Sequence, residues 1–101
     1  MSAVNAGSVA DLKPNEKKVV EVNGAKVLVV NLNGSIFAIG DKCTHRGCSL
    51  SKGTIMGDNL KCACHGSTFN LKTGALVKGP AKNPEPMYKV KIEENQIMVS
   101  A

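Results

Sequence analysis

Aromatic residues are scarce in this chain. Its 101 residues include no Trp, one Tyr and two Phe, and Arg46 is the only arginine beside twelve lysines. Nucleobases stack on aromatic rings, and bidentate recognition of bases or phosphates favours arginine over lysine. We therefore expect no nucleic-acid partner. The apolar core has to be built from Val, Ile, Leu and Met.

Long apolar runs are also absent. The longest, Val27-Leu28-Val29-Val30, is ended by Asn31, whereas a membrane helix needs ~20 apolar residues. The first eight residues have neither the basic start nor the apolar run of a signal peptide. We expect no membrane span, a cytoplasmic location and a monomer.

The length fits one compact domain. The net charge is +5, from 13 basic and 8 acidic residues. The lysines are spread along the sequence, which favours a solvated basic surface over a dedicated patch, and an acidic partner is the alternative interpretation.

Two Asn-Gly dipeptides separate three β-rich segments. The predicted strands cover residues 17–22, 25–32 and 35–39. Asn-Gly readily adopts the positive φ angles of a type I′ turn, so Asn23-Gly24 and Asn33-Gly34 predict an antiparallel meander.

A second hairpin is predicted near the end of the chain. Residues 87–93 alternate apolar and charged side chains, and Glu94-Asn95 leads into residues 96–99. No segment has a helical period with caps over more than two turns. The fold class is therefore mainly β.

Every Cys and His lies in two short clusters of the Gly-rich centre. The first is Cys43-Thr44-His45-Arg46-Gly47-Cys48, and the second is Cys62-Ala63-Cys64-His65-Gly66-Ser67. Each offers a thiol and an imidazole close together, and the neighbouring glycines let the backbone approach a metal centre. We expect a metal centre held by two loops that supply two ligands each.

Cys-x-His in one loop and Cys-x-x-His in a second resembles the signature of the Rieske family. The resemblance implies a soluble electron carrier with one [2Fe-2S] cluster rather than an enzyme. It implies that Cys43 and Cys62 bind one iron and that His45 and His65 bind the other. Two thiolates and two neutral imidazoles leave the cluster less negative than four thiolates would, so it accepts an electron more easily.

The resemblance also implies an architecture. We expect an antiparallel β-sandwich of small sheets with a cluster-binding subdomain of two loops. The single domain would span residues 1–101, with the cluster-binding part at about 40–83 and a β base at about 9–39 and 84–101.

Further residues take roles only through the resemblance. Family members with the additional cysteine pair, here Cys48 and Cys64, join the two loops by a disulfide; reduced thiols are the alternative. The family's proline loop matches a segment that starts at Gly79 and Pro80.

Three residues beside the ligands bear on redox behaviour. Ser67 stands where high-potential members donate a hydroxyl to a bridging sulfide, whereas Phe69 replaces the tyrosine that is their second donor. We therefore expect a potential below that of the respiratory-complex proteins. Arg46 replaces the usual apolar residue of quinol oxidases, which favours a carrier that meets an acidic redox partner. A solvent-exposed loop arginine and a Phe69 that only packs in the core are the simpler interpretations.

Other site classes fit less well. The same four residues could form a structural Cys2His2 zinc site, although Cys-x-His is an unusual zinc spacing. A haem attachment motif is excluded, because a single residue separates Cys62 from Cys64. The sequence leaves open whether the carrier is free-standing or the electron-transfer subunit of a larger oxygenase or oxidoreductase.

Overall fold

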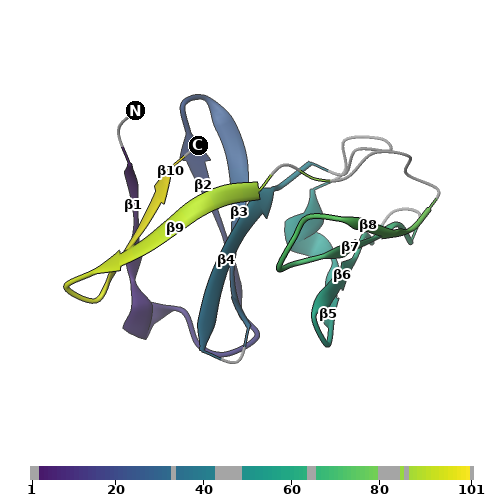
Figure 1. Cartoon of the computed structure of the whole chain (residues 1–101), viewed down its shortest axis with the longest axis horizontal. Helices are drawn as coiled ribbons and strands as arrows, with labels where there is room; N and C mark the ends of the chain where they lie inside the picture. Colours follow the sequence, from purple (N-terminus) through teal and green to yellow (C-terminus); the bar gives the residue numbers. More distant parts are fainter. Residues whose placement is uncertain are drawn as a thin grey trace.

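Two antiparallel sheets make up the fold (Figure 1). The computed structural model describes residues 3–32, 34–42, 49–63, 66–79, 85 and 87–100. The six-stranded sheet has the order β1-β10-β9-β4-β3-β2, and the four-stranded sheet has the order β5-β6-β7-β8. The expectation of a mainly β, antiparallel fold is confirmed.

The elements have the following bounds. In the six-stranded sheet they are β1 (Val4–Ser8), β2 (Lys17–Val22), β3 (Ala25–Leu32), β4 (Ser35–Gly40), β9 (Met87–Glu93) and β10 (Gln96–Ser100). In the four-stranded sheet they are β5 (Thr54–Met56), β6 (Asn59–Lys61), β7 (Thr68–Asn70) and β8 (Leu76–Lys78). The described residues also include two short 3-10 turns, η1 (Val9–Asp11) and η2 (Leu50–Lys52).

The predicted hairpins are confirmed. Asn23 and Gly24 have φ angles of 50° and 82°, as a type I′ turn requires. Glu94 and Asn95, with φ angles of 49° and 65°, connect β9 to β10 in the same way. Asn33 lies outside the described residues, but Leu32 and Ser35 on either side of that turn are paired.

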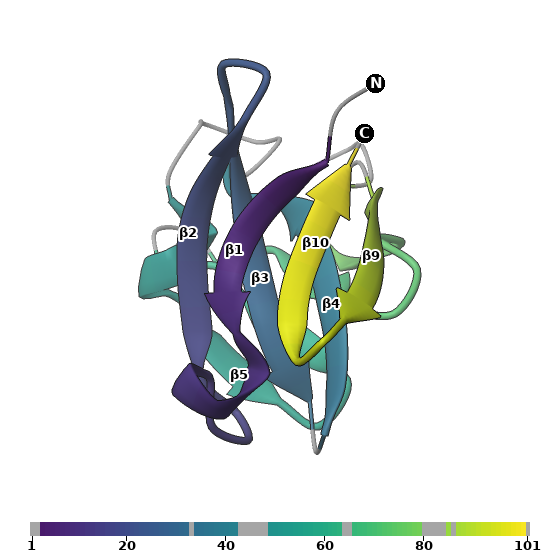
Figure 2. The same ribbon diagram turned by 90° about the vertical axis from the view of Figure 1, so that its left-hand side faces the viewer.

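Strand β1 was not predicted. It pairs with β10, for example Val4 with Val99, and its register shifts between Asn5 and Ser8. Ala6 is its one buried residue, so the sequence offers no alternating pattern. The Nζ of Lys18 in β2 donates a hydrogen bond to the Ala6 carbonyl at 2.7 Å. The six-stranded sheet therefore curls until β1 lies beside β2 (Figure 2).

Strand β3 is buried on both of its faces. Val27 and Val29 pack inside the curled sheet, in a cluster that includes Ile97 and Val99. The alternate residues Leu28, Val30 and Leu32 pack toward the four-stranded sheet, in a cluster completed by Ile39, Leu50, Leu60, Cys62, Phe69 and Leu71. Burial on two faces explains the continuous apolar run at residues 27–30.

The six-stranded sheet forms the base of the molecule, and the chain leaves this base and returns to it at one place. β4 ends at Gly40 and β9 begins at Met87, and Ile39 pairs with Met87 across these two strands. The four-stranded sheet is thus inserted between paired strands of the base. Within the described ranges, no helix has the length and apolarity to cross a membrane.

We predict that Leu28→Ala loosens the four-stranded sheet. Removing a fully buried Leu side chain costs about 2–5 kcal/mol of unfolding free energy, measured by urea denaturation. Amide hydrogen exchange at Leu60 and Phe69 should also accelerate, because both residues share its cluster.

The control is Val29→Ala, on the opposite face of the same strand. It should destabilise the base without selectively accelerating exchange at Leu60 and Phe69. Equal acceleration in both variants would contradict the division of the core into two clusters.

Candidate metal centre

Of the four predicted ligands, Cys62 lies within the described residues. Cys43, His45 and His65 lie outside them. The other predicted positions outside them are Cys48, Cys64, Arg46 and Pro80. In the described ranges no three His, Cys, Asp or Glu side chains gather into a metal-binding group.

The second ligand loop connects β6 to β7 and is closed by backbone hydrogen bonds. The Cys62 amide donates to the Ser67 carbonyl at 2.7 Å, and the Gly66 amide donates to the Cys62 carbonyl at 3.1 Å. Gly66 has a φ angle of 81°, which a non-glycine residue adopts only with strain. These bonds fix the two ends of the segment that contains His65.

Cys62 is buried in the apolar cluster between β3 and the four-stranded sheet. Its exposed fraction is 2%, it forms no disulfide, and it shares an apolar cluster with Leu60 and Phe69. Ser67 and Phe69 are both fully buried. A thiolate in this position would be shielded from water on the protein side.

Asp41 closes the base of the first ligand loop. Its Oδ2 accepts a hydrogen bond from the Ser49 hydroxyl at 2.6 Å, and its Oδ1 accepts one from the Ser51 amide at 3.0 Å. Its carbonyl also accepts from the Leu50 amide at 2.5 Å. Lys42 pairs with Ser49 in an isolated β-bridge, so the ends of the segment that contains Cys43 and His45 are held together.

Asp41 was not among the residues predicted from the sequence. Its exposed fraction is 2%, and a carboxylate is buried only when its hydrogen bonds are satisfied. The sequence contains a signal for this role: Asp41 lies two residues before Cys43, and Ser49 and Ser51, separated by one residue, follow the loop.

Gly53 permits a close approach between the segments that flank the two ligand loops. A Cβ on Gly53, which follows η2, would overlap the carbonyl oxygen of Lys61. The backbone that leaves the first loop therefore lies against the residue just before Cys62. This contact accounts for a glycine at position 53.

A third segment is anchored in a similar way. The Glu85 amide donates to the Gly74 carbonyl at 2.9 Å, and a Cβ on Gly74 would overlap the Glu85 carbonyl. Glu85 is 4% exposed, and Gly79 is exposed just after β8. The segment that starts at Gly79 and Pro80 is thus fixed at its far end against the turn between β7 and β8.

The residues present fit an iron–sulfur cluster. Cys62 would supply a buried soft sulfur donor at the start of a loop that backbone hydrogen bonds close. The contact of Gly53 with Lys61 holds the residue just before Cys62 against the segment that follows η2.

Comparison with known proteins decides the family. The model of the Rieske [2Fe-2S] domain matches residues 2–97. The chain belongs to the Rieske [2Fe-2S] family. It accordingly carries one [2Fe-2S] cluster, and the zinc alternative is not favoured.

Two curated Rieske relatives differ in length. The chain is 34% identical over 100 residues to the biphenyl dioxygenase ferredoxin subunit of Pseudomonas sp. (strain KKS102), covering 98% of this chain and 92% of that protein. It is 38% identical over 93 residues to apoptosis-inducing factor 3 of Homo sapiens, covering 92% of this chain. It spans only 15% of the length of that relative.

A solved Rieske structure has the same fold. The ferredoxin of carbazole 1,9a-dioxygenase from Nocardioides aromaticivorans IC177 superposes with a TM-score of 0.94 at 27% identity. The alignment covers 99% of this chain and 98% of that one. The expected Rieske fold is confirmed.

We predict that Asp41→Ala releases the first Rieske ligand loop. The change removes the acceptor of the half-buried Ser51 amide and leaves the Ser49 hydroxyl with Ser51 Oγ as its remaining partner. The lost hydrogen bonds cost about 1–3 kcal/mol together, because both groups are only partly shielded from water. The holoprotein should lose its visible absorption faster in the presence of an iron chelator.

The matched control is Asp58→Ala, which removes the same charge from a 55% exposed side chain. Asp41→Asn keeps one acceptor oxygen and should recover part of the lifetime. If all three variants bleach at the wild-type rate, Asp41 does not position the loop.

Proposed function

We propose that the cluster is held by Cys43 and Cys62 on one iron and by His45 and His65 on the other. One observation carries this assignment: the buried thiol of Cys62 stands at the start of a closed loop that abuts the exit of the first loop. The spacing of both ligand pairs supports it. The chain's role is then to carry single electrons between partner proteins.

The bound cluster supplies the one-electron redox couple. The chain's own residues fix and cover it. Asp41 and Gly53 hold the first loop, and the hydrogen bonds between Cys62 and Ser67 hold the second. Leu60 and Phe69 exclude water from beneath Cys62, which limits hydrolytic loss of iron.

We also propose a disulfide between Cys48 and Cys64. Each ligand loop has one such cysteine, and the segments that flank these loops are in contact through Gly53 and Lys61. The bond would join the two loops and keep them closed over the cluster.

A single sample tests the ligands and the disulfide. The purified protein should contain two irons and two acid-labile sulfides and, when reduced, give an electron paramagnetic resonance signal of a mixed-ligand diiron species. Unfolded without reductant, it should show two alkylatable thiols rather than four.

Variants separate the two proposals. Cys62→Ser should abolish the signal, whereas Cys48→Ser should keep it and shorten the lifetime of the cluster. A colourless protein with bound zinc, or full iron content in Cys62→Ser, would overturn the ligand assignment. Four alkylatable thiols would overturn the disulfide alone.

We propose that Ser67 and Phe69 set the reduction potential. Ser67 lies at the closed end of the second ligand loop, where its hydroxyl would donate to a bridging sulfide. Phe69 shares an apolar cluster with Cys62 but has no donor to offer its sulfur. The potential would then fall below that of members with both donors.

We predict that Phe69→Tyr raises the potential and that Ser67→Ala lowers it. A donor to a sulfur ligand stabilises the reduced state more than the oxidised state, and about 1.4 kcal/mol of that difference corresponds to about 60 mV for one electron. Redox titration of the holoprotein measures both shifts.

Phe37→Tyr is the control, because Phe37 packs against the same cluster from β4. It should leave the potential unchanged. An unshifted potential in Phe69→Tyr would remove the proposed role of the missing hydroxyl.

The partners belong to the proposal as well. Relatives of nearly the same length are ferredoxins of dioxygenase systems, so a reductase as donor and an oxygenase as acceptor are the partners we propose. An acidic acceptor surface beside Arg46, a monomer and a cytoplasmic location stay predictions. So do the cover formed by the segment from Gly79 and Pro80 and the division into a cluster-binding part and a base within one domain.

A further inference from the structure

The excess of positive charge lies in one part of the sequence, residues 40–83. Residues 40–83 contain seven basic and two acidic residues, a net charge of +5. The remaining residues contain six of each and are neutral overall. The lysines are spread along the sequence, as noted above, but their excess over the acids lies wholly in the cluster-binding part.

Neither acid of this part neutralises the lysines near the second loop. Asp41 is buried and its carboxylate accepts from Ser49 and Ser51, and Asp58 lies 3.5 Å from Lys72. The residues outside the described ranges include no Asp or Glu. Within the described part, the exposed Lys61 and Lys78 therefore have no carboxylate partner in an ion pair.

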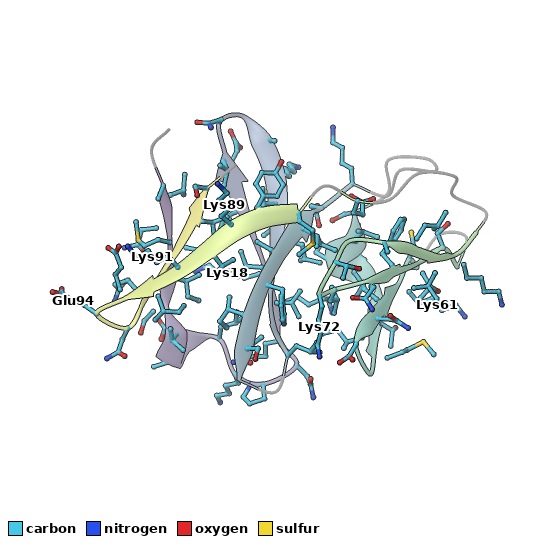
Figure 3. The ribbon with its side chains drawn as sticks, viewed as in Figure 1. Lys18, Lys61, Lys72, Lys89, Lys91 and Glu94 are labelled. Atoms are coloured by element: carbon cyan, nitrogen blue, oxygen red, sulfur yellow. The ribbon has the colours of Figure 1, made fainter. Side chains whose placement is uncertain are left out.

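The register of the four-stranded sheet places Lys61 and Lys78 on the same face. Lys61 in β6 pairs with Thr68 in β7, and Thr68 pairs with Lys78 in β8. The register shifts between Thr68 and Phe69, so Leu76 and Lys78 oppose adjacent residues of β7 and lie on opposite faces, although they are two residues apart in β8. Directly opposed residues project to the same side of a sheet, and two strand spacings separate the lysine backbones by about 10 Å. Figure 3 shows Lys61 at the end of the molecule away from Lys89 and Lys91.

The opposite face of the sheet is the buried one. Leu60 and Phe69 are fully buried in the apolar cluster between β3 and the four-stranded sheet, and Leu76 packs against this cluster. Because side chains alternate along β6 and β7, Lys61 and Thr68 lie on the outward face, and the register shift in β8 puts the exposed Lys78 on that face, opposite Thr68. Met56 lies on this outer face, two residues along β5 from Thr54, and is 54% exposed.

This outer face adjoins the second ligand loop. Lys61 directly precedes Cys62, and Thr68 directly follows Ser67. A Cβ on Gly66 would lie 3.5 Å from the Cε of Lys61, so the Lys61 side chain runs along the loop beside the residue that follows His65. The Thr68 hydroxyl also donates to the Gly66 carbonyl at 3.2 Å.

We infer that the outer face of the four-stranded sheet, centred on Lys61 and Lys78, docks a carboxylate-rich surface of the redox partner protein. Two cations with no carboxylate partner attract and orient such a surface. The exposed Met56 adds the flexible apolar contact that protein interfaces favour. The inference rests on the proposed ligands, because docking here brings the partner to the loop that contains Cys62 and His65.

Small redox ions of opposite charge test the surface. Stopped-flow mixing would measure the oxidation of the reduced holoprotein by hexacyanoferrate(III), an anion, and by tris(phenanthroline)cobalt(III), a cation. Lys61→Gln with Lys78→Gln should slow the reaction with the anion roughly three- to ten-fold at about 0.01 M ionic strength. The reaction with the cation should accelerate, and both effects should fade at high salt.

Lys89→Gln is the matched control for Lys61→Gln alone, because each change removes one exposed lysine, from β9 and from β6. Lys89→Gln should change both rates by less than about two-fold at the same ionic strength, and Lys61→Gln should change them by more. Equal effects from these two single variants would overturn the inference, because overall charge would then explain the rates. Unchanged rates in the Lys61 and Lys78 variants would overturn it as well.

The potential and paramagnetic signal of each variant separate this inference from the proposed function. If the wild type lacks the mixed-ligand signal, the ligand assignment has failed, whatever the rates. An intact signal and potential with rates that ignore Lys61 and Lys78 would overturn the docking surface alone.

Poly-L-glutamate serves as the probe for a protein-like acidic surface. It should protect the wild type from hexacyanoferrate(III) and protect the Lys61 and Lys78 double variant less. Vesicles of anionic phospholipid should protect the wild type no better than neutral vesicles. Protection by anionic vesicles but not by poly-L-glutamate would overturn a protein partner in favour of a membrane surface.

Discussion

The two-sided burial of β3 holds the base and the four-stranded sheet in one arrangement. Val27 and Val29 close the interior of the base, and Leu28 and Val30 provide the floor on which the second sheet rests. Burial of apolar surface has no directional preference of its own. In this fold it fixes the relative position of the two sheets, because alternate side chains of β3 belong to the two different clusters. The second sheet, with Cys62 just after β6, is therefore positioned against a central strand of the fold.

Around this core, backbone contacts and buried carboxylates do what large aromatic side chains do in other small proteins. Gly53 and Gly74 permit two close approaches between segments that are distant in the sequence. The Asp41 carboxylate gathers the Ser49 hydroxyl and the Ser51 amide at the first loop. Buried polar groups whose hydrogen bonds are satisfied impose a specific geometry, since any other arrangement leaves them unpaired. A chain with three aromatic residues can thus keep its ligand loops in register.

Sequence patterns predicted the strands with local signals and missed those without them. Asn23-Gly24 is a turn whose positive φ angles follow from residue type, and Glu94-Asn95 interrupts the alternating pattern of residues 87–93. The flanking strands could therefore be located to within a residue. Strand β1 is recruited by the exposed edge of β10, a long-range pairing that leaves no pattern in its own residues. The same holds for the site. The spacing of the Cys and His residues is local and could be read, whereas the role of Asp41 depends on which atoms the fold brings to its carboxylate.

The pairing of Ile39 with Met87 has a consequence for how such a domain can change over time. The exit and re-entry points of the insertion are neighbours, so its length adds little to the entropy of closing the base. Evolution can lengthen, shorten or exchange the inserted four-stranded unit while the six-stranded base keeps its own strand pairing. The same base can in this way serve different electron acceptors, because only the segment inserted between β4 and β9 has to change.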